Sequence, residues 1–298
     1  MAMRSSILGL AMVLAPCDSP REAAVEPPAI VEAAEVEPLP EEPWPPAVVS
    51  TPKPDVPATA TATAPEPARS GPAIRAFTDV EYDRGLSGSA RVRGAKARKT
   101  DEVRTLFADA GVEFPPRQLL FRVFKKEREL EVWASASSRG SLTHVTTYSV
   151  CAASGRAGPK TREGDWQVPE GFYAIDLFNP QSNYHLSMRV DYPNARDRSL
   201  KSTGGQIMIH GDCVSIGCVA ITDERIEELW VMSRALQSGR PRVHLFPGRD
   251  LDGFIENATD PQLAAFWEGL RAVDDAFLEQ HVIPAITWDA RGVYRPKS

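Results

Sequence analysis

A proline-rich segment near the start of the chain separates a part that cannot fold from a part that can. Residues 18–72 hold 14 of the 26 prolines, and Glu, Ala and Thr fill most of the other positions. Ten acidic residues against three basic ones give this segment a net charge of −7. Because it has few large apolar side chains, it cannot bury enough surface to offset the entropy of ordering its backbone. We therefore expect a disordered, extended tether over residues 18–72.

The first 17 residues are typical of a targeting segment. Arg4 precedes an apolar run from Ile7 to Ala15, which is too short to span a bilayer and fits the core of a secretory signal peptide. The run ends in "LAPC", which resembles a bacterial lipobox and makes Cys17 a candidate lipidation site. An ordinary signal peptide with an incidental cysteine is the alternative. We expect a protein of the bacterial cell envelope, located in the periplasm and anchored by lipid to a membrane.

The rest of the chain is electrically neutral. Residues 73–298 contain 30 basic and 30 acidic residues, so the net charge of −6 comes from the tether. A neutral domain offers no electrostatic basis for binding nucleic acid. Residues 73–117 are expected to form a basic, loop-like arm followed by a short helix over 100–111, capped by Thr100 or Asp101. The arm is either solvated or in contact with an anionic polymer.

From residue 118 onward, strand patterns come first and helix patterns come late. Residues 119–135 alternate apolar and polar positions around a charged turn and predict a β-hairpin. Helical periodicity returns over residues 222–239 and 261–280. This order, without β-α-β alternation, predicts a mostly β domain with peripheral α-helices over residues 118–298. Further strands are expected at 142–150, 171–178, 184–190 and 205–211.

The segment "GGQIMIHGDCVSIGCVAITD" places His210 and Cys218 at the ends of two short apolar stretches. A catalytic thiol needs a nearby base and backbone N–H groups that can hold an oxyanion. If the intervening loop folds back, His210 can reach Cys218, and the amides of Ile216, Gly217 and Cys218 can form the oxyanion hole. The same residues are also compatible with a metal site or with a disulfide beside an unrelated histidine.

Several motifs resemble those of the L,D-transpeptidase family, which has the YkuD-type, β-sandwich-like catalytic domain. His210-Gly211 and Ser215-Ile216-Gly217-Cys218 match the two elements that carry the family's histidine and nucleophilic cysteine. The resemblance is strongest to the YafK-like branch and covers roughly residues 118–290. It rests on "SGRAGPKTREGD" (154–165), "PEGFY" (169–173), "YHLS" (184–187), "YPNARDR" (192–198) and "HGDCVSIGCVAITD" (210–223).

The resemblance implies acyl transfer on peptidoglycan stem peptides. Cys218 would attack the stem amide and form a thioester, and His210, held by a backbone carbonyl near Gly211, would move the proton. No cofactor or metal is required, and a peptidoglycan-linked protein is a further possible partner. Ile216 and Ala220 replace a histidine and an arginine common in the family, which favours hydrolysis over cross-linking. The substrate-binding candidates are Ser215, Tyr173, Tyr184, His185 and Arg198, although His185 is equally compatible with a hydrogen-bonded histidine of the core.

Two other questions stay open at the level of sequence. With Cys17 lipidated, three cysteines remain in an oxidising compartment, so Cys151 and Cys213 either form a disulfide or both stay reduced. A zinc site of His210, Cys213, Cys218 and His185 has ligand-like spacing but lacks paired C-x-x-C knuckles. A catalytically idle peptidoglycan-binding lipoprotein is the alternative function, and the intact His210/Cys218 pair argues against it.

Overall fold

The computed structural model describes residues 90–297. The expected signal peptide, the lipidation site at Cys17, the tether over 18–72 and the first part of the basic arm lie outside the described residues. Within the described range, no helix combines the length and apolar character needed to cross a membrane.

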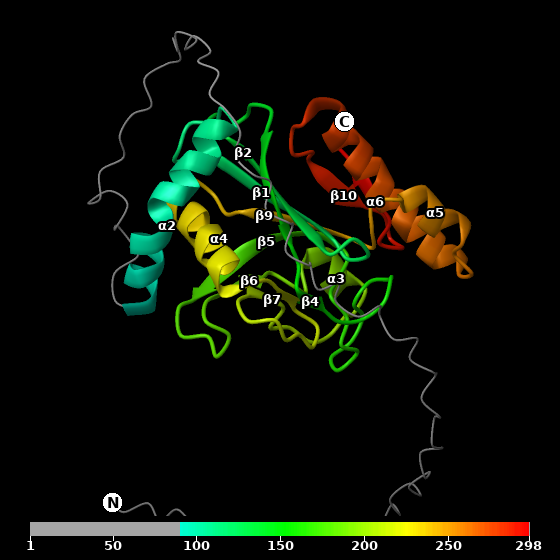
Figure 1. Ribbon diagram of the computed structural model, residues 1–298. Coiled ribbons are helices and arrows are strands. Elements are labelled where there is room, and N and C mark those ends of the chain that lie inside the picture. The colour runs from blue at the N-terminus through cyan, green and yellow to red at the C-terminus, as the bar shows by residue number, and fades with distance from the viewer. Residues whose placement is uncertain (1–89, 298) are drawn as a thin grey trace, which may run out of the picture. The chain divides into compact units, whose positions relative to one another are not determined.

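A nine-stranded sheet forms the centre of the domain, with strand order β3-β2-β1-β9-β5-β6-β7-β8-β4. Neighbouring strands are antiparallel except for β1 with β9 and β7 with β8. The sheet is curled and carries few helices, which confirms the expected mostly β domain with peripheral helices (Figure 1). The strands are β1 (Gln118–Phe124), β2 (Glu129–Ser135), β3 (Thr143–Ser149), β4 (Ala152–Ala153), β5 (Gly171–Asn179), β6 (Ser187–Val190), β7 (Met208–His210), β8 (Val219–Ala220) and β9 (Arg242–Phe246).

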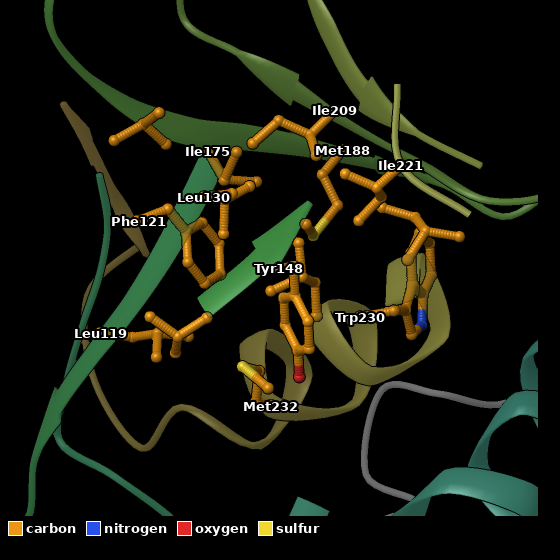
Figure 2. Packing of buried hydrophobic residues seen from close by; sticks show 14 of the residues in the cluster. Leu119, Phe121, Leu130, Tyr148, Ile175, Met188, Ile209, Ile221, Trp230 and Met232 are labelled. Atoms are coloured by element: carbon orange, nitrogen blue, oxygen red, sulfur yellow. The ribbon is translucent and has the colours of Figure 1, made fainter. Parts of the chain in front are cut away.

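Both faces of the central strands are buried, and each face has its own helices. In β1, Phe121 and Val123 point to the side covered by α2 (Ala90–Asp109) and α4 (Asp223–Ala235). Figure 2 shows this core, in which Trp230 and Met232 of α4 pack against strand residues. Phe124, on the opposite face of β1, packs with α5 (Leu251–Glu256) and α6 (Pro261–Gln280). Alternate side chains of β1 thus pack into two separate hydrophobic layers, one on each face of the sheet.

The remaining elements are short. Helix α3 (Ala195–Ser199) follows β6, and Asn194 caps it with a reciprocal hydrogen bond to Asp197. Strands β10 (Ile286–Trp288) and β11 (Tyr294–Pro296) form a separate antiparallel pair after α6. The helix predicted over residues 261–280 is confirmed as α6, which begins at Pro261 and ends at Gln280. The Asp260 side chain caps its first turn.

The expected loop-like arm is wrong for residues 90–99. Helix α2 begins at Ala90 rather than near Thr100, so Thr100 and Asp101 lie inside the helix and do not cap it. Contacts with the rest of the domain hold the additional turns at residues 90–99. Val92 and Ala95 are buried, and the Arg98 guanidinium pairs with Glu227 of α4. A basic stretch that looks solvated in the sequence is therefore a docked helix. The sequence did not reveal this because the partners of Arg91 and Arg98 lie 89 to 129 residues away along the chain.

Candidate active site

His210 is the last residue of β7 and lies almost fully buried, with 2% of its surface exposed. Its Nδ1 lies 2.6 Å from the carbonyl oxygen of Gly211. Because a carbonyl can only accept a hydrogen bond, Nδ1 carries the proton and Nε2 has a free lone pair in the neutral ring. Burial lowers the pKa of His210 from its ordinary value, which keeps the imidazole neutral at pH 7. The ring is thus in the tautomer of a general base.

Cys218 directly precedes β8, which runs parallel to β7 with His210 opposite Ala220. Residues opposite one another share a face, and side chains two apart on a strand share it too. Cys218 therefore points to the same face as His210, while Ile209 and Val219 point into the core on the other face. The Cys218 Sγ lies 3.8 Å from the carbonyl oxygen of Gln206, at the approach to β7.

The Cys218 thiol is protonated in this environment. Burial raises its pKa above the ordinary value, and hydrogen bonding near Met208 and the charge of Lys160 offset only part of that rise. Since burial also lowers the pKa of His210, both groups are uncharged at pH 7. The hydrogen-bond partner of the thiol in this structure is the Gln206 carbonyl rather than His210 Nε2. A neutral thiol and a neutral imidazole can exchange a proton at the moment of attack if they come within hydrogen-bond distance.

A disulfide fixes the loop between the two residues. Cys213 is bonded to Cys151, which resolves the open question of their pairing and leaves Cys218 as the free cysteine among the described residues. A cysteine engaged in a disulfide cannot ligate zinc, and no group of three His, Cys, Asp or Glu side chains within residues 90–297 is arranged to hold a metal ion. The disulfide attaches the loop to Cys151, the residue before β4. The amide of Cys151 also donates a hydrogen bond to the Ala220 carbonyl of β8.

The expected oxyanion hole is only partly free in this structure. The amide of Gly217 donates to the Ser154 hydroxyl, and the amide of Cys218 donates to Ser215 Oγ at 3.0 Å. Along residues 90–297, the Ile216 amide is left without a hydrogen-bond partner, and its side chain is 75% exposed. Gly217 has φ +92°, a conformation that favours glycine. An oxyanion hole that uses Ile216 and Gly217 therefore requires a ligand to displace one hydroxyl oxygen, and one that also uses Cys218 requires it to displace two.

Gly211 supplies the carbonyl expected to hold His210, whereas Ser215 lies at the site without contacting an open binding surface. The Gly211 amide donates to the Leu186 carbonyl, so its contribution is the carbonyl oxygen that orients His210. The Ser215 hydroxyl accepts from the Cys218 amide and donates to the Cys218 carbonyl at 2.6 Å, which closes the turn before the nucleophile. Its contacts are with the turn itself rather than with an open binding surface.

Tyr184 and His185 lie beside His210 and face different ways. The half-exposed Tyr184 ring packs on the imidazole of His210, with the ring centres 4.7 Å apart. The His185 side chain turns instead toward α4, where its Nε2 lies 2.7 Å from Glu227 Oε1. Glu227 also accepts from Arg98 Nε at 3.0 Å. His185 therefore belongs to a polar network beneath the site and does not line it.

Tyr173 and Arg198 are not in contact with the thiol. Tyr173 is buried in the core beneath the sheet, and its hydroxyl lies 3.1 Å from Asp197 Oδ2. The strand motif places it on a covered face of β5, and its assignment to substrate binding stays a prediction. Arg198 is exposed, donates to the Pro193 carbonyl, and lines a cavity of about 680 Å³ together with Gln206. Arg198 thus shares a cavity with Gln206, the residue whose carbonyl lies next to Cys218 Sγ.

Three residues at the site were not predicted as site residues. Ser154 holds the Gly217 amide and donates to the Trp166 carbonyl at 2.9 Å. The buried Lys160 ammonium is held by Asp165 and by the Arg162 carbonyl. Gln206 provides the carbonyl next to Cys218 Sγ. Ser154 and Lys160 belong to the "SGRAGPK" motif, so the sequence contained a signal for them, whereas nothing in the sequence marks Gln206.

Comparisons with known proteins identify a catalytic-domain family and a related protein. Residues 120–241 match the model of the L,D-transpeptidase catalytic domain, YkuD. YafK of Escherichia coli strain K12, provisionally named as an L,D-transpeptidase, is 35% identical over 171 residues, which make up 56% of this chain and 69% of the relative.

Similar solved structures include two bacterial proteins of low identity. The helical cell shape determining protein Pgp2 of Campylobacter jejuni (K307A mutant) is 21% identical with a TM-score of 0.39, over 61% of this chain and 64% of that one. Bd1075 of Bdellovibrio bacteriovorus is 21% identical with a TM-score of 0.34, over 56% of this chain and 62% of that one. This chain thus spans less than two thirds of both.

Proposed function

The chain belongs to the L,D-transpeptidase family of enzymes, and on that premise we propose that it transfers acyl groups of peptidoglycan stem peptides through a thioester on Cys218. The observation that carries the proposal is the placement of two groups. His210 presents a free Nε2 because Nδ1–H is bound to the Gly211 carbonyl, and Cys218 lies on the same face of the neighbouring parallel strand.

Acylation begins with the neutral pair. Cys218 Sγ attacks the carbonyl carbon of a stem amide while its proton passes to His210 Nε2, so that a C–S bond forms and the oxygen becomes an anion. His210 then returns the proton to the nitrogen as the C–N bond breaks, which releases an amine and leaves the thioester. The backbone bond at Nδ1 stabilises the imidazolium that exists between these two steps.

The oxyanion is proposed to bind at the turn 215–218. The Ile216 amide has no competing partner within the described chain, while the Gly217 amide can leave the Ser154 hydroxyl when a stronger acceptor arrives. A negatively charged oxygen forms a stronger hydrogen bond than a neutral hydroxyl does, so this exchange favours the transition state. Lys160 adds a positive charge that lowers the pKa of Cys218, although burial outweighs it.

We expect water to compete well for the thioester. The side chain beside the nucleophile is the exposed, apolar Ile216, and Ala220 on the same face offers no polar group. Neither can hold an incoming amine, and holding a second reactant is a large part of how aminolysis outruns hydrolysis. In deacylation, the oxygen of water or the nitrogen of an amine bonds to the thioester carbonyl carbon while its proton passes to His210. The C–S bond then breaks, and His210 returns the proton to sulfur. A protein attached to the stem would be one amine released in the first step.

Product analysis tests the proposal. The protein would be incubated with defined tetrapeptide muropeptides, with and without a protein-linked stem, and the products separated and weighed by liquid chromatography and mass spectrometry. We expect tripeptide products to exceed 3–3 cross-linked dimers, and the Cys218→Ala variant to give neither. Dominant 3–3 dimers would contradict the hydrolytic preference alone. Absence of both products with the native protein, under conditions in which a related enzyme works, would favour the idle binding protein.

A further inference from the structure

A buried ion pair lies where β1 ends and β5 begins. Lys125 directly follows β1, Glu170 directly precedes β5, and Lys125 Nζ lies 2.9 Å from Glu170 Oε1. Both side chains are almost completely shielded from solvent. Desolvating two charges often costs as much free energy as their attraction returns, so the pair alone is weak evidence for a stabilising role. Its other hydrogen bonds indicate what it does, and most of them go to the β4–β5 loop (residues 154–168).

These hydrogen bonds tie down both ends of the β4–β5 loop. The Lys125 ammonium donates to the carbonyl oxygens of Arg156 at 2.7 Å and Val168 at 3.2 Å. Glu170 Oε1 accepts from the Gly158 amide at 2.7 Å. No helix or strand forms between β4 and β5, so the bonds to the ion pair take the place of a hydrogen-bonded ladder. The position of the loop therefore depends on the position of the two buried side chains.

The same loop reaches the turn that carries the nucleophile. The Ser154 hydroxyl donates to the Trp166 carbonyl at 2.9 Å and accepts from the Gly217 amide. Burial raises the pKa of the Cys218 thiol, and the charge of Lys160 on this loop opposes that rise. The loop is thus held at its ends by the ion pair, while its own groups act on the turn and on the thiol.

Helix α6 supplies a further partner of the Glu170 carboxylate. Trp267 of α6 is buried, and its indole Nε1 donates to Glu170 Oε2 at 2.8 Å. This helix follows residues 120–241, which match the catalytic-domain model. Without the indole N–H, Oε2 would lose the partner that this structure gives it. An oxygen of a buried carboxylate left without a donor is unfavourable, so the carboxylate and the groups bonded to it would shift.

We propose that Trp267 and Glu170 are positioning residues for the reaction at Cys218. Through the β4–β5 loop they set the place of Ser154, and with it the orientation of the Gly217 amide. The inference rests on the proposed function, in which that amide receives the oxyanion. A hydrogen-bond donor that is displaced from the oxyanion stabilises the transition state less, so a small shift of the loop lowers the rate. Helix α6 therefore affects the rate without touching the substrate.

The test compares the same substitution at two buried tryptophans. Trp267→Phe keeps an aromatic ring and the Lys125–Glu170 pair but removes the N–H, whereas Glu170→Gln would bury an ammonium without its counter-charge and impair folding. Trp230→Phe is the matched control, because this residue of α4 is also buried and its indole N–H has no hydrogen-bond partner among residues 90–297. Both variants lose part of a buried ring, so a general loss of stability would appear in both.

The kinetic result should separate the two variants. We expect the maximal rate of Cys218 acylation by a carbapenem to fall by about tenfold in Trp267→Phe, with the half-saturating carbapenem concentration unchanged. This pattern follows because the affected amide contributes mainly in the transition state. Trp230→Phe should change neither quantity. Equal slowing in both variants, an unchanged rate in Trp267→Phe, or a rise in the half-saturating concentration alone would overturn the proposal.

Hydrogen exchange tests the positioning without relying on acyl transfer. In Trp267→Phe the amides of the β4–β5 loop, that of Gly158 included, should exchange about tenfold faster than in the native protein, whereas Trp230→Phe should leave them unchanged. If the native protein transferred no acyl group while this difference in exchange persisted, the proposed function would fail and the dependence of the loop on Trp267 would stand. Unchanged exchange in Trp267→Phe would overturn the proposal even if acylation slowed.

Discussion

His210 and Cys218 lie on neighbouring strands, yet the protein holds them by different means. His210 is buried at the end of β7, and the groups around it come from packed elements: the Gly211 carbonyl, the Tyr184 ring, and His185 beneath it. Cys218 ends a largely exposed loop that is fixed by a disulfide and by two serine hydroxyls. The base is therefore positioned by the fold, whereas the nucleophile is positioned by a few local bonds.

The support behind His210 extends to the first described helix. Arg98 of α2 and His185 both bond to Glu227 of α4, and a Cβ placed on Gly211 would lie 3.1 Å from the His185 Cβ. Arg91 of α2 donates to the carbonyls of Ser182 and His185, which lie in the loop that leads into β6. Helix α2 thus belongs to the catalytic unit, because it holds the segment that packs against the base.

The largest effect is expected from removing the base. His210→Gln keeps a polar side chain of similar size but cannot accept the thiol proton at neutral pH. We expect the acylation rate of Cys218 to fall by about 10²–10⁴-fold, the usual contribution of a general base. The rate would be followed by intact-protein mass spectrometry with a carbapenem as acylating agent. A loss smaller than tenfold would mean that another group takes the proton.

Removing the disulfide should affect the loop that carries Cys218 rather than the surroundings of His210. In the Cys151→Ser/Cys213→Ser variant, a link between residues 62 positions apart is lost, and we expect the free energy of unfolding to fall by about 2–4 kcal/mol. Urea unfolding followed by tryptophan fluorescence would measure it. Acylation at Cys218 should persist but slow down, since the loop 211–218 loses its anchor. An unchanged midpoint and an unchanged rate would show that the serine hydroxyls suffice.

A smaller effect is expected from the network behind His210. Glu227→Gln removes the negative charge shared by Arg98 and His185, and we expect acylation to slow by about tenfold through misplacement of the base. A positioning role predicts a lower rate with the same pH midpoint, and combination with His210→Gln should add little further loss. Glu224→Gln, an exposed change on the same helix, is the control. Equal losses in both variants would show a general effect on α4.

The pH dependence separates a neutral pair from an ion pair. Burial lowers the pKa of His210 and raises that of Cys218, so both groups are uncharged through the neutral range. As the pH falls below 6.5 and through the lowered pKa, His210 becomes protonated and cannot accept the thiol proton, so the acylation rate should drop there. Alkylation of Cys218 by iodoacetamide should keep rising with pH beyond 9. A plateau of alkylation at pH 6–7 would instead indicate a thiolate–imidazolium pair.

The sequence predicted the elements whose signal is local. The hairpin β1–β2 follows from alternation around a charged turn, with Val123 opposite Leu130, and α6 follows from its periodicity and its cap. Strand β9 was missed, because the five residues after Pro241 have no local partner and the residues of β1 that pair with them lie 122 positions earlier. The helical start of α2 was missed for the same reason, since its partners are on α4 and before β6.

The site was predictable at its two reacting residues and less so around them. His210, Cys218 and the carbonyl of Gly211 follow from motif order, and the structure places them on one face as that order implies. The burial of Tyr173 was not predicted, because a strand motif fixes a residue's position but not which face of the strand is covered. The amide partners Ser154 and Ser215 required knowledge of the folded turn. The sequence therefore indicates which side chains could react, whereas it does not indicate which backbone amides are already occupied by serine hydroxyls.

The most direct test of the account is where a covalent acyl group forms. Protein beginning near Ala73 would be treated with a carbapenem, digested, and mapped by mass spectrometry, with Cys218→Ala as the control. We predict a single adduct on Cys218, present in the native protein and absent in the variant, while the Cys151–Cys213 disulfide stays intact. An adduct on Cys151 or Cys213, or labelling that survives Cys218→Ala, would contradict the assignment of Cys218 as the nucleophile.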